Sequence, residues 1–355
     1  MRKIRMGIIG LGAISEVHAQ GILSSSDAVI SALCTRRLDK LLKKGEEYGI
    51  PECNRFTDYR KLLECEDVDA VSICTPNNLH YLMGMESVRC CKPFLIEKPV
   101  ALNRHEAKAL KESAEVNKIP NMVCFSYRYK SIARNARDIL KQGHLGKIFH
   151  VNVEYSQGWC ISDEMPYLWR HSKELSGSGT LGDLGVHMID LIRFIVGDIS
   201  KVCSLTGTFV NKRKTPNSDE YTSVDVDDYS NFLAELEGGI PATFAVTRYA
   251  FGRGNYQRIV IYGSKGGLIY EIDDKSQELS ICIGEVSQRA QDYHKIKISP
   301  KYEGDQMQSF FDIVNGKSDG LSATMEDGYI AQVVLDAILK SSSEGRWIST
   351  EEKDL

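Results

Sequence analysis

Apolar positions in the first third of the chain form short runs separated by charged, amphipathic segments. Strands are predicted at Ile4–Ile9, Val29–Thr35, Ala70–Cys74, Phe94–Ile96 and Met122–Phe125. Helices are predicted between them at Ile14–Ser24, Leu38–Tyr48 and Arg104–Asn117. Short apolar strands that alternate with helices are typical of parallel βαβ units. This part of the chain therefore predicts a doubly wound Rossmann sheet.

Beyond about Arg128 the pattern changes to longer strands in which apolar and polar residues alternate. These strands are predicted at Ile148–Tyr155, Tyr229–Leu236, Ala242–Arg248 and Gln257–Tyr262. Helices are predicted at about Leu181–Val196, Asp305–Val314 and Asp327–Ser341, and a loop at the polar stretch Asn211–Glu220. Such alternation is typical of a large open, mostly antiparallel sheet with one face packed on helices. We therefore expect an α/β protein with a Rossmann domain over residues 1–128 and a second α/β domain over residues 129–355.

Composition narrows the classes of partner and compartment. The 355 residues carry a formal net charge of −4, with 44 basic and 48 acidic side chains, so a nucleic-acid partner is not expected. No apolar run approaches the roughly 20 residues that span a bilayer, and we expect neither a signal peptide nor a membrane anchor. The ten cysteines are scattered without a Cys-x-x-Cys pair, which fits a reducing cytoplasm. The sequence shows no metal-ligand spacing, so no metal is predicted.

A glycine-rich turn follows the first predicted strand. Gly10-Leu11-Gly12-Ala13-Ile14-Ser15 lies between that strand and the first helix, which is the context of a dinucleotide-binding fingerprint. Gly10 permits the tight turn, and Gly12 lets a pyrophosphate approach the backbone N–H groups at the helix N-terminus. Ser15 stands where the fingerprint has Gly or Ala, and it is still small enough for helix–strand packing. Cofactor contact is predicted for Gly10, Gly12, Ala13 and Ile14.

The end of the second strand bears on the choice of dinucleotide. An NAD enzyme ordinarily has an Asp or Glu there that binds the adenosine ribose, whereas this chain has Thr35-Arg36-Arg37. A hydroxyl and two guanidiniums can bind a 2′-phosphate, and no carboxylate repels it. NADP is therefore predicted, with NAD as the alternative cofactor. The competing interpretation is that the arginines only solvate the start of a helix.

Further motifs follow the later strands. They are Thr75-Pro76-Asn77-Asn78-Leu79-His80, Glu97-Lys98-Pro99, and Gly177-Ser178-Gly179-Thr180-Leu181-Gly182-Asp183-Leu184-Gly185-Val186-His187-Met188-Ile189-Asp190. In this order the motifs resemble the Gfo/Idh/MocA family, which is named after glucose–fructose oxidoreductase, inositol dehydrogenase and a rhizopine-catabolism protein. The resemblance covers nearly the whole chain, including Trp169-Arg170 and Tyr262-Gly263-Ser264-Lys265-Gly266.

The resemblance has implications for fold, substrate and site. It implies a Rossmann domain followed by an α/β domain whose open sheet commonly forms an oligomer interface. It also implies that Lys98, Asp183 and His187 line the place where nicotinamide meets substrate. Family members act on inositols, free sugars, sugar phosphates and nucleotide sugars, so a sugar or polyol substrate is implied.

The residue types themselves support a similar role. Lys98 lies just beyond a parallel strand, where open α/β sheets bind ligands, and its cation can stabilise developing alkoxide charge. Asp183 and His187 are four residues apart on a predicted helix and so share a face. A histidine titrates near pH ~6.5 and can accept a hydroxyl proton, while the carboxylate orients it or binds substrate. Gly182 and Gly185 indicate close approach of another backbone or of the cofactor. The alternatives are a solvated lysine and a surface Asp/His pair.

Other candidates surround these three residues. Cofactor contact is also predicted for Cys74, Thr75, Asn77, His80, Glu97, Lys98, Arg128, Trp169 and Arg170. His80 and Asn77 are expected to shape the nicotinamide pocket. Arg128 contacts the cofactor or a substrate hydroxyl, or else forms a salt bridge at a helix start. Trp169 and Arg170 close the site or bind the cofactor, or else the aromatic ring is structural. His18 and Asp190 are interpreted as packing residues.

The sequence thus predicts a cytoplasmic NAD(P)-dependent oxidoreductase that oxidises a secondary alcohol of a sugar or polyol, or reduces the matching ketone. A homodimer or homotetramer is expected, because the long strands offer a sheet face that few helices remain to cover. One alternative is a redox-assisted glycosidase or self-recycling oxidoreductase that retains its cofactor. Another is a sensor that binds NADP(H) without turnover, although Lys98, Asp183 and His187 together argue against it.

Overall fold

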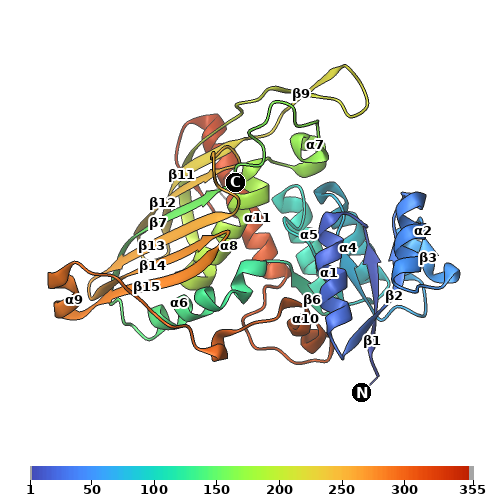
Figure 1. The fold of residues 1–355 in the computed structure, drawn as a ribbon, viewed down its shortest axis with the longest axis horizontal. Helices are drawn as coiled ribbons and strands as arrows, with labels where there is room; N and C mark the ends of the chain where they lie inside the picture. The colour runs from blue at the N-terminus through green and yellow to red at the C-terminus, as the bar shows by residue number, and fades with distance from the viewer. Residues whose placement is uncertain (1, 352–355) are drawn as a thin grey trace. The chain divides into compact units, whose positions relative to one another are not determined.

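The computed structural model describes residues 2–351, which divide into two compact units (Figure 1). The first unit runs to Phe125 and also takes in Asp305–Ile330, whereas the second holds Ser126–Gly304 and the chain from Ala331 onward. The expected division into residues 1–128 and 129–355 differs from this in two places. Residues 126–128, which were expected in the first domain, group with the second unit. Residues 305–330, which were expected in the second domain, group with the first unit.

The return of residues 305–330 to the first unit has a packing explanation. Helix α10 (Gln306–Val314) packs against α1 (Ala13–Ser24), and a Cβ at Gly21 would lie only 3.2 Å from the Met307 side chain. The Val123 N–H also donates to the Ala323 carbonyl at 2.9 Å. These contacts join positions far apart in the sequence, so the local pattern of apolar residues did not reveal them.

The first unit is built on a six-stranded sheet in the order β3-β2-β1-β4-β5-β6. Its strands are β1 (Ile4–Ile9), β2 (Ala28–Cys34), β3 (Arg55–Phe56), β4 (Ala70–Ile73), β5 (Phe94–Ile96) and β6 (Asn121–Val123). All neighbouring strands run parallel. The strand order reverses between β1 and β4, which is where doubly wound sheets bind ligands. The prediction of a Rossmann sheet is confirmed.

Helices pack against this sheet and bury its strands, which is why the strands are apolar. Besides α1 and α10 they are α2 (Leu38–Glu47), α3 (Tyr59–Leu63), α4 (His80–Arg89) and α5 (Arg104–Val116), with short 3₁₀ turns η1 (Glu52–Asn54) and η2 (Asn77–Leu79). Every residue of β4 and β5 is buried, as expected for central strands of a parallel sheet. Asn103 and Asp305 begin α5 and α10 by accepting backbone N–H groups of the first turn, which stabilises each helix start.

The second unit is built on a nine-stranded sheet in the order β16-β15-β14-β13-β7-β12-β11-β8-β17. Its strands are β7 (Ile148–Ser156), β8 (Ile199–Gly207), β11 (Tyr229–Leu236), β12 (Ile240–Thr247), β13 (Tyr256–Gly263), β14 (Gly266–Asp273), β15 (Ser276–Ile283), β16 (His294–Lys295) and β17 (Ile348–Ser349). Among these described strands only β7 and β12 pair in parallel. The prediction of a mostly antiparallel sheet is confirmed.

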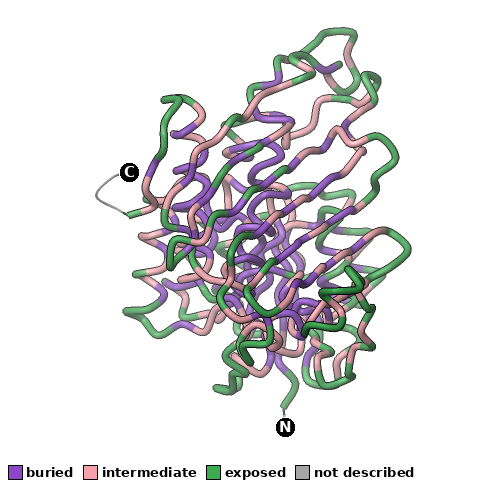
Figure 2. The backbone as a smooth tube through the Cα atoms, turned by 90° about the vertical axis from the view of Figure 1, so that its left-hand side faces the viewer, coloured by how far each residue is buried: buried purple, intermediate pink, exposed green. Residues whose placement is uncertain are grey.

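Burial alternates along the central strands of the second sheet, as the tube in Figure 2 shows. In β11 and β12 buried residues alternate with more exposed ones, which is typical of a sheet with one face on the core and one face open. The open side includes Leu205, 62% exposed, and Leu233, 50% exposed. The unit's helices are α6 (Ser131–Lys141), α7 (Lys173–Ser176), α8 (Val186–Ile195), α9 (Gly284–Ala290) and the later part of α11 (Met325–Glu344), with short turns η3 (Ser126–Tyr129), η4 (Trp169–His171) and η6 (Pro300–Tyr302).

In the second unit one local expectation was wrong, and one predicted helix has a different first turn. The stretch Asn211–Glu220 was expected to be a loop, but β9 (Lys212–Lys214) lies within it and pairs with β10 (Tyr221–Ser223). Arg213 stabilises this hairpin because its buried guanidinium donates to the Cys160 carbonyl at 2.7 Å. The helix expected over Leu181–Val196 begins as the π-helical segment η5 (Leu181–Gly185), and only then continues as α8. A π turn of this kind is often found at functional sites.

Across residues 2–351, no helix is both long enough and apolar enough to cross a membrane.

Candidate cofactor and active site

The glycine turn between β1 and α1 has the geometry of a pyrophosphate site. Gly10 has a φ of +92°, and a Cβ there would lie 2.7 Å from the Cys74 carbonyl oxygen, so a side chain is excluded. A Cβ at Gly12 would meet no atom within 4 Å, and no side chain caps α1. The first N–H groups of α1 therefore stay open to an anion. Ser15, at the third fingerprint position, donates its hydroxyl to the Gly12 carbonyl at 2.6 Å.

The turn that follows β2 places the two predicted arginines differently. The Arg37 guanidinium binds the Asp39 carboxylate at 2.7 Å, and its backbone N–H donates to the Thr35 hydroxyl at 3.3 Å. Arg36 is exposed, and no hydrogen bond or ion pair ties it to another residue of the 2–351 range. Arg36 is thus the better placed of the two to bind a phosphate at this end of the sheet.

A buried network lies behind the loop that carries Lys98. The two ring nitrogens of His18 bond to the Ser72 hydroxyl at 2.6 Å and to Glu97 Oε1 at 2.9 Å. The other oxygen of Glu97 accepts the backbone N–H of Lys98 at 3.2 Å. Burial raises the pKa of Glu97, but the hydrogen bond and charge of His18 outweigh this effect and lower the pKa to about 2. Glu97 therefore fixes the backbone of Lys98, a different role from the predicted cofactor contact.

The same network contains a possible set of metal ligands. His18, Glu97 and Cys124 bring their ligand atoms within 4.8 Å of one another. Spacing along the chain did not reveal this group, because its members come from a helix and from the ends of two strands. Since both His18 nitrogens and both Glu97 oxygens are already hydrogen bonded, we interpret the group as a hydrogen-bonded support for the Lys98 loop.

His80 joins two loops at the carboxyl ends of the strands. Its ring nitrogens face the Pro99 carbonyl at 2.7 Å and the Thr75 carbonyl at 2.9 Å, and the side chain is fully buried. Burial lowers the pKa of His80, although the two carbonyls oppose this. Cys74 is also buried, and Asn77 begins η2 just before His80. His80 therefore ties together the loops after β4 and β5, while its role in shaping a nicotinamide pocket stays a prediction.

In the second unit, Asp183 and His187 lie on one continuous segment. Asp183 belongs to η5 and His187 to the first turn of α8. The His187 ring packs edge-on against Tyr127, with ring centroids 4.9 Å apart. Two guanidiniums flank the Asp183 carboxylate: Arg170 Nε lies 3.8 Å from Oδ1, and Arg248 Nη1 lies 3.9 Å from Oδ2. The segment thus carries a carboxylate flanked by two guanidiniums and, four residues later, an imidazole of a type that can transfer a proton.

The start of η5 is fixed by a close backbone approach. A Cβ at Gly179 would lie 1.9 Å from the Asp227 carbonyl oxygen. The Asp227 carboxylate also accepts the N–H groups of Gly179 and Leu181, each at 2.7 Å. The sequence assigned a close approach to Gly182 and Gly185. The structure shows a close backbone approach at Gly179 instead, and a Cβ at Gly185 would meet only the Leu181 side chain.

Arg128 and Trp169 take roles that the sequence left open. Arg128 is buried and forms a two-pronged ion pair with Asp190, at 2.8 and 2.5 Å. This favours the salt-bridge alternative for Arg128 and gives Asp190 its packing role. The Arg170 guanidinium lies over the Trp169 ring, 4.4 Å from its centroid. Trp169 therefore supports the arginine that reaches Asp183.

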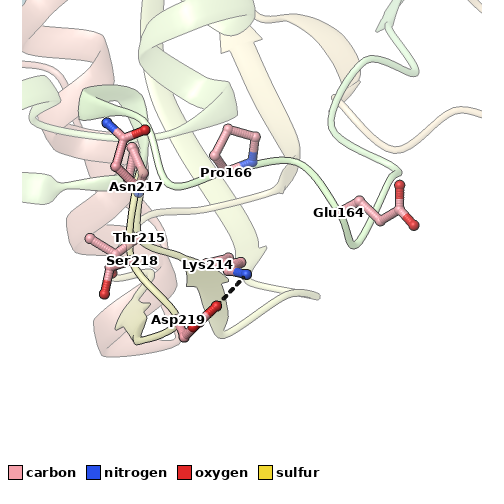
Figure 3. A pocket seen from close by; sticks show the side chains of 8 residues that line it. Glu164, Pro166, Lys214, Thr215, Asn217, Ser218 and Asp219 are labelled. Atoms are coloured by element: carbon pink, nitrogen blue, oxygen red, sulfur yellow. Dashed lines mark hydrogen bonds and ion pairs between the residues drawn. The ribbon is translucent and has the colours of Figure 1, made fainter.

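A separate pocket of about 350 Å³ lies at the β9–β10 hairpin (Figure 3). It is lined by Glu164, Pro166, Lys214, Thr215, Pro216, Asn217, Ser218 and Asp219. Lys214 and Asp219 form an ion pair across it at 2.8 Å. None of the predicted site residues lines this pocket.

Sequence reasoning missed two cations that the structure places at the candidate sites. Lys40 of α2 donates to the Leu11 carbonyl of the glycine turn at 3.2 Å, and Arg248 lies beside Asp183. Lys40 could have been noticed in the sequence, because it lies four residues after Arg36, close to the predicted phosphate-binding residues. No local signal marked Arg248, since it comes from a distant strand end. Of the catalytic candidates, Lys98 belongs to the first unit, and Asp183 and His187 belong to the second.

Together, the doubly wound sheet and its open glycine turn define a dinucleotide-binding protein built of two α/β units. The chain belongs to the Gfo/Idh/MocA family of oxidoreductases. Residues 4–125 match the family described as "Oxidoreductase family, NAD-binding Rossmann fold", and residues 133–269 match the GFO/IDH/MocA C-terminal domain.

Relatives and solved structures agree with this assignment over the whole chain. Levoglucosan dehydrogenase of Pseudarthrobacter phenanthrenivorans is 25% identical over 99% of this chain and 99% of that protein. A structure of levoglucosan dehydrogenase in complex with NADH and L-sorbose has a TM-score of 0.91 at 25% identity, covering 99% of this chain and 100% of that one. An oxidoreductase domain protein from Kribbella flavida is 30% identical over 99% of this chain and 100% of that one, with a TM-score of 0.89.

Proposed function

We propose that this protein is an NAD(P)-dependent dehydrogenase that oxidises a secondary hydroxyl of a sugar or polyol, or reduces the matching ketone. The observation that carries the proposal is the pair Asp183 and His187 on the η5–α8 segment, with two guanidiniums against the carboxylate. The substrate class is supported by the similarity to levoglucosan dehydrogenase. It is also supported by inositol 2-dehydrogenase of Rhizobium meliloti, 24% identical over 98% of this chain and 99% of that protein.

In this mechanism the chain's own residues handle the proton and the reacting oxygen. The turn at Gly10 and Gly12 would hold the pyrophosphate, and the bound nicotinamide supplies the hydride acceptor or donor. His187 accepts the hydroxyl proton in oxidation and returns it in reduction. Asp183 orients the imidazole and favours its charged form. The Lys98 ammonium polarises the substrate oxygen and stabilises alkoxide charge.

We further propose that NADP is the preferred cofactor. Thr35, Arg36 and Arg37 occupy the position where a carboxylate would select NAD. Because Arg37 is engaged by Asp39, Arg36 is the main donor to a 2′-phosphate in this proposal, and Lys40 adds positive charge near the glycine turn.

We also propose a homodimer or homotetramer that uses the open face of the second sheet. Exposed apolar side chains on its strands, Leu205 and Leu233 among them, support this assembly. Light scattering at micromolar concentration should give a dimeric or tetrameric mass, and a monomeric mass would contradict the proposal. All ten cysteines are free thiols, which supports the cytoplasm as the compartment.

A substrate panel tests the proposed activity. Levoglucosan, myo-inositol and D-glucose would be offered with NAD⁺ and NADP⁺, and the absorbance of the reduced nicotinamide would be followed. We expect turnover with at least one sugar or polyol. We also expect Lys98→Met to lower turnover while the control Lys43→Met, on the exposed side of α2, leaves it unchanged. Tight NADPH binding without turnover on any panel member, or full turnover in Lys98→Met, would contradict the proposal.

A further inference from the structure

The loop before β11 directs its carboxylates at the backbone of neighbouring elements. Asp225 accepts the Lys173 N–H at the start of α7, at 2.6 Å. The Oδ2 atom of Asp228 accepts two N–H groups of the chain that follows β8. Asp227 lies between them in the sequence, and its carboxylate binds the start of η5, the segment that carries Asp183. Of these three side chains, that of Asp227 is bonded to the segment of the candidate acid–base pair.

The Asp227 carboxylate is buried and uses both of its oxygens. Its Oδ1 accepts the Gly179 N–H and its Oδ2 accepts the Leu181 N–H, each at 2.7 Å, while the residue is only 7% exposed. Burial raises the pKa of the Asp227 carboxyl, and the two N–H groups oppose this rise. Because a buried carboxylate destabilises the fold unless donors compensate its charge, these two bonds explain how the fold tolerates it.

Backbone contacts hold the same short stretch of chain. The Thr180 N–H donates to the Asp227 carbonyl at 2.9 Å, and the Thr180 hydroxyl donates to the Asp228 carbonyl at 2.9 Å. A Cβ at Gly179 would lie 1.9 Å from the Asp227 carbonyl oxygen, so a side chain is excluded there. Residues 179–181 are therefore fixed to the loop before β11 by side-chain and backbone bonds together. We call this set of bonds the Asp227 clamp.

The other end of the segment is held independently of the clamp. Arg128 of η3 forms its two-pronged ion pair with Asp190 of α8, and both side chains are buried. Between the clamp and this ion pair lies the π turn, in which the Val186 N–H donates to the Leu181 carbonyl five residues back. The segment also packs against β11 and β12. The π turn thus lies between two points that are both fixed within the second unit.

The π turn determines how Asp183 lies relative to His187. Asp183 is inside the π segment, and His187 follows it in the first turn of α8. Relaxation to an α-helix would pair the Val186 N–H with the Gly182 carbonyl, four residues back, and would rotate Asp183 about the helix axis. Because the Asp190 ion pair holds α8, this rotation would displace Asp183 and leave His187 in place.

We propose that Asp227 is a positioning residue, which holds the π turn and so fixes the Asp183 carboxylate relative to His187. The inference rests on the proposed function, because it gives Asp227 a part in the same proton transfer. The Asp227 side chain is buried against the backbone of η5, so it acts through the clamp and does not touch the substrate. Its loss should therefore lower kcat much more than it raises KM.

The chain offers two matched controls. Asp225 belongs to the same loop and binds the start of a helix, but that helix, α7, carries none of the catalytic candidates. Ser341 of α11 is fully buried, and its hydroxyl accepts the Ser204 N–H at 3.0 Å and donates to the Arg346 carbonyl at 2.7 Å. Asp225→Ala controls for the loss of a capping carboxylate, and Ser341→Ala controls for a loss of stability away from η5. Both variants should keep kcat within about twofold of wild type.

Steady-state kinetics with the best substrate of the panel test the inference. Asp227→Ala should lower kcat about tenfold or more, while KM changes less than about threefold, because a displaced catalytic group slows the chemical step. Asp227→Asn keeps one acceptor oxygen and should lie between Asp227→Ala and wild type. In an Asp183→Asn background, Asp227→Ala should have almost no further effect. An unchanged kcat, equal losses in both backgrounds, or an equal loss in either control overturns the inference.

Hydrogen exchange of the full chain tests the clamp without turnover. The amides of Gly179 and Leu181 should exchange about tenfold faster in Asp227→Ala than in wild type, while the amides around Asp190 stay protected. Unchanged exchange at residues 179–181 overturns the inference. If Asp227→Ala does not fold, Asp227→Asn is measured against the same criteria. A normal kcat in Asp183→Asn, with faster exchange in Asp227→Ala, would instead contradict the proposed function.

Discussion

Both units bury charged groups, but they satisfy them to different degrees. In the first unit both His18 nitrogens and both Glu97 oxygens are hydrogen bonded, at 2.6 to 3.2 Å. In the second unit Arg248 is equally buried, yet two of its nitrogens have no hydrogen-bond partner among residues 2–351 and Asp183 lies 3.9 Å away. A complete network fixes a scaffold, whereas an incomplete one can respond to a ligand or a proton. The difference supports a scaffolding role for the first network and, under the proposed function, a chemical role for the second.

The largest expected effect is on the stability of the first unit. Glu97→Leu leaves His18 buried without its carboxylate, so the free energy of unfolding should fall by about 3 kcal/mol in urea titration. The control Glu115→Leu removes a carboxylate that is 55% exposed and 3.7 Å from Lys111, and should lose less than about 1 kcal/mol. Equal losses in the two variants would show that the His18 network is not a scaffold.

The second expected effect is on turnover and belongs to the second unit. If His187 transfers the proton, His187→Ala should lower kcat by roughly a hundredfold, with nucleotide affinity little changed. The rise in oxidation rate through the histidine range should also flatten. His144→Ala, which removes an exposed histidine of the same unit, should behave like wild type. Near-wild-type turnover in His187→Ala would move the base elsewhere, with Lys98 as the next candidate.

A smaller effect concerns cofactor choice in the first unit. Arg36→Ala should weaken NADPH binding about tenfold while NADH binding stays the same, because a charge-assisted bond to the 2′-phosphate is lost. Arg37→Ala should have a smaller effect, since Arg37 is paired with Asp39. Titration calorimetry measures both. Equal affinities of the wild type for NADPH and NADH would contradict the NADP proposal.

The smallest effect is a difference in acid sensitivity between the units. Burial, with Arg248 and Arg213, lowers the pKa of His171 to about 4, so the unfolded chain takes up a proton at higher pH than the folded one. The stability that neutral His171 provides is present above pH ~6.5 and is lost as the pH falls toward about 4. Glu97, with a pKa of about 2, loses its contribution to stability only as the pH falls from ~4.5 to about 2.

Hydrogen exchange measured at pH 7, 5.5 and 4.5 tests this order. The segment around His171, whose Nδ1 accepts the Leu168 N–H at 3.0 Å, should lose protection before the β1–β4 core of the first unit. His171→Gln should remove the pH dependence of that segment. Earlier loss of protection in the first unit would contradict the assigned pKa directions.

Much of the fold could be predicted because it follows from the local periodicity of apolar and polar residues. The alternation of short apolar strands with helices predicted the first sheet, and the two-residue period of Tyr229–Leu236 predicted the second. Short strands such as β3 and β9 were not predicted. Arg55–Phe56 and Lys212–Lys214 are too short and too charged to show an alternation of apolar and polar residues. The placement of residues 305–330 in the first unit was also not predicted from the sequence, because it depends on packing between segments that are distant in the chain.

The candidate site was predictable only where one motif contains all its parts. Gly10 and Gly12 lie in one turn, and Asp183 and His187 lie on one segment within a motif that resembles the family, so these residues could be selected from the sequence. Their supports come from elsewhere: Arg248 follows a later strand, and no spacing rule connects it to Asp183. The π turn between the members of the pair also has no sequence signature that distinguishes it from an ordinary helix.

The most direct test of the account is the turnover of the double variant Asp183→Asn with His187→Ala, measured with the best panel substrate beside both single variants. If the two side chains act as one proton-transfer unit, the double variant should be no slower than the slower single variant. If the two losses multiply instead, Asp183 and His187 act independently, and the central claim about the second unit is contradicted.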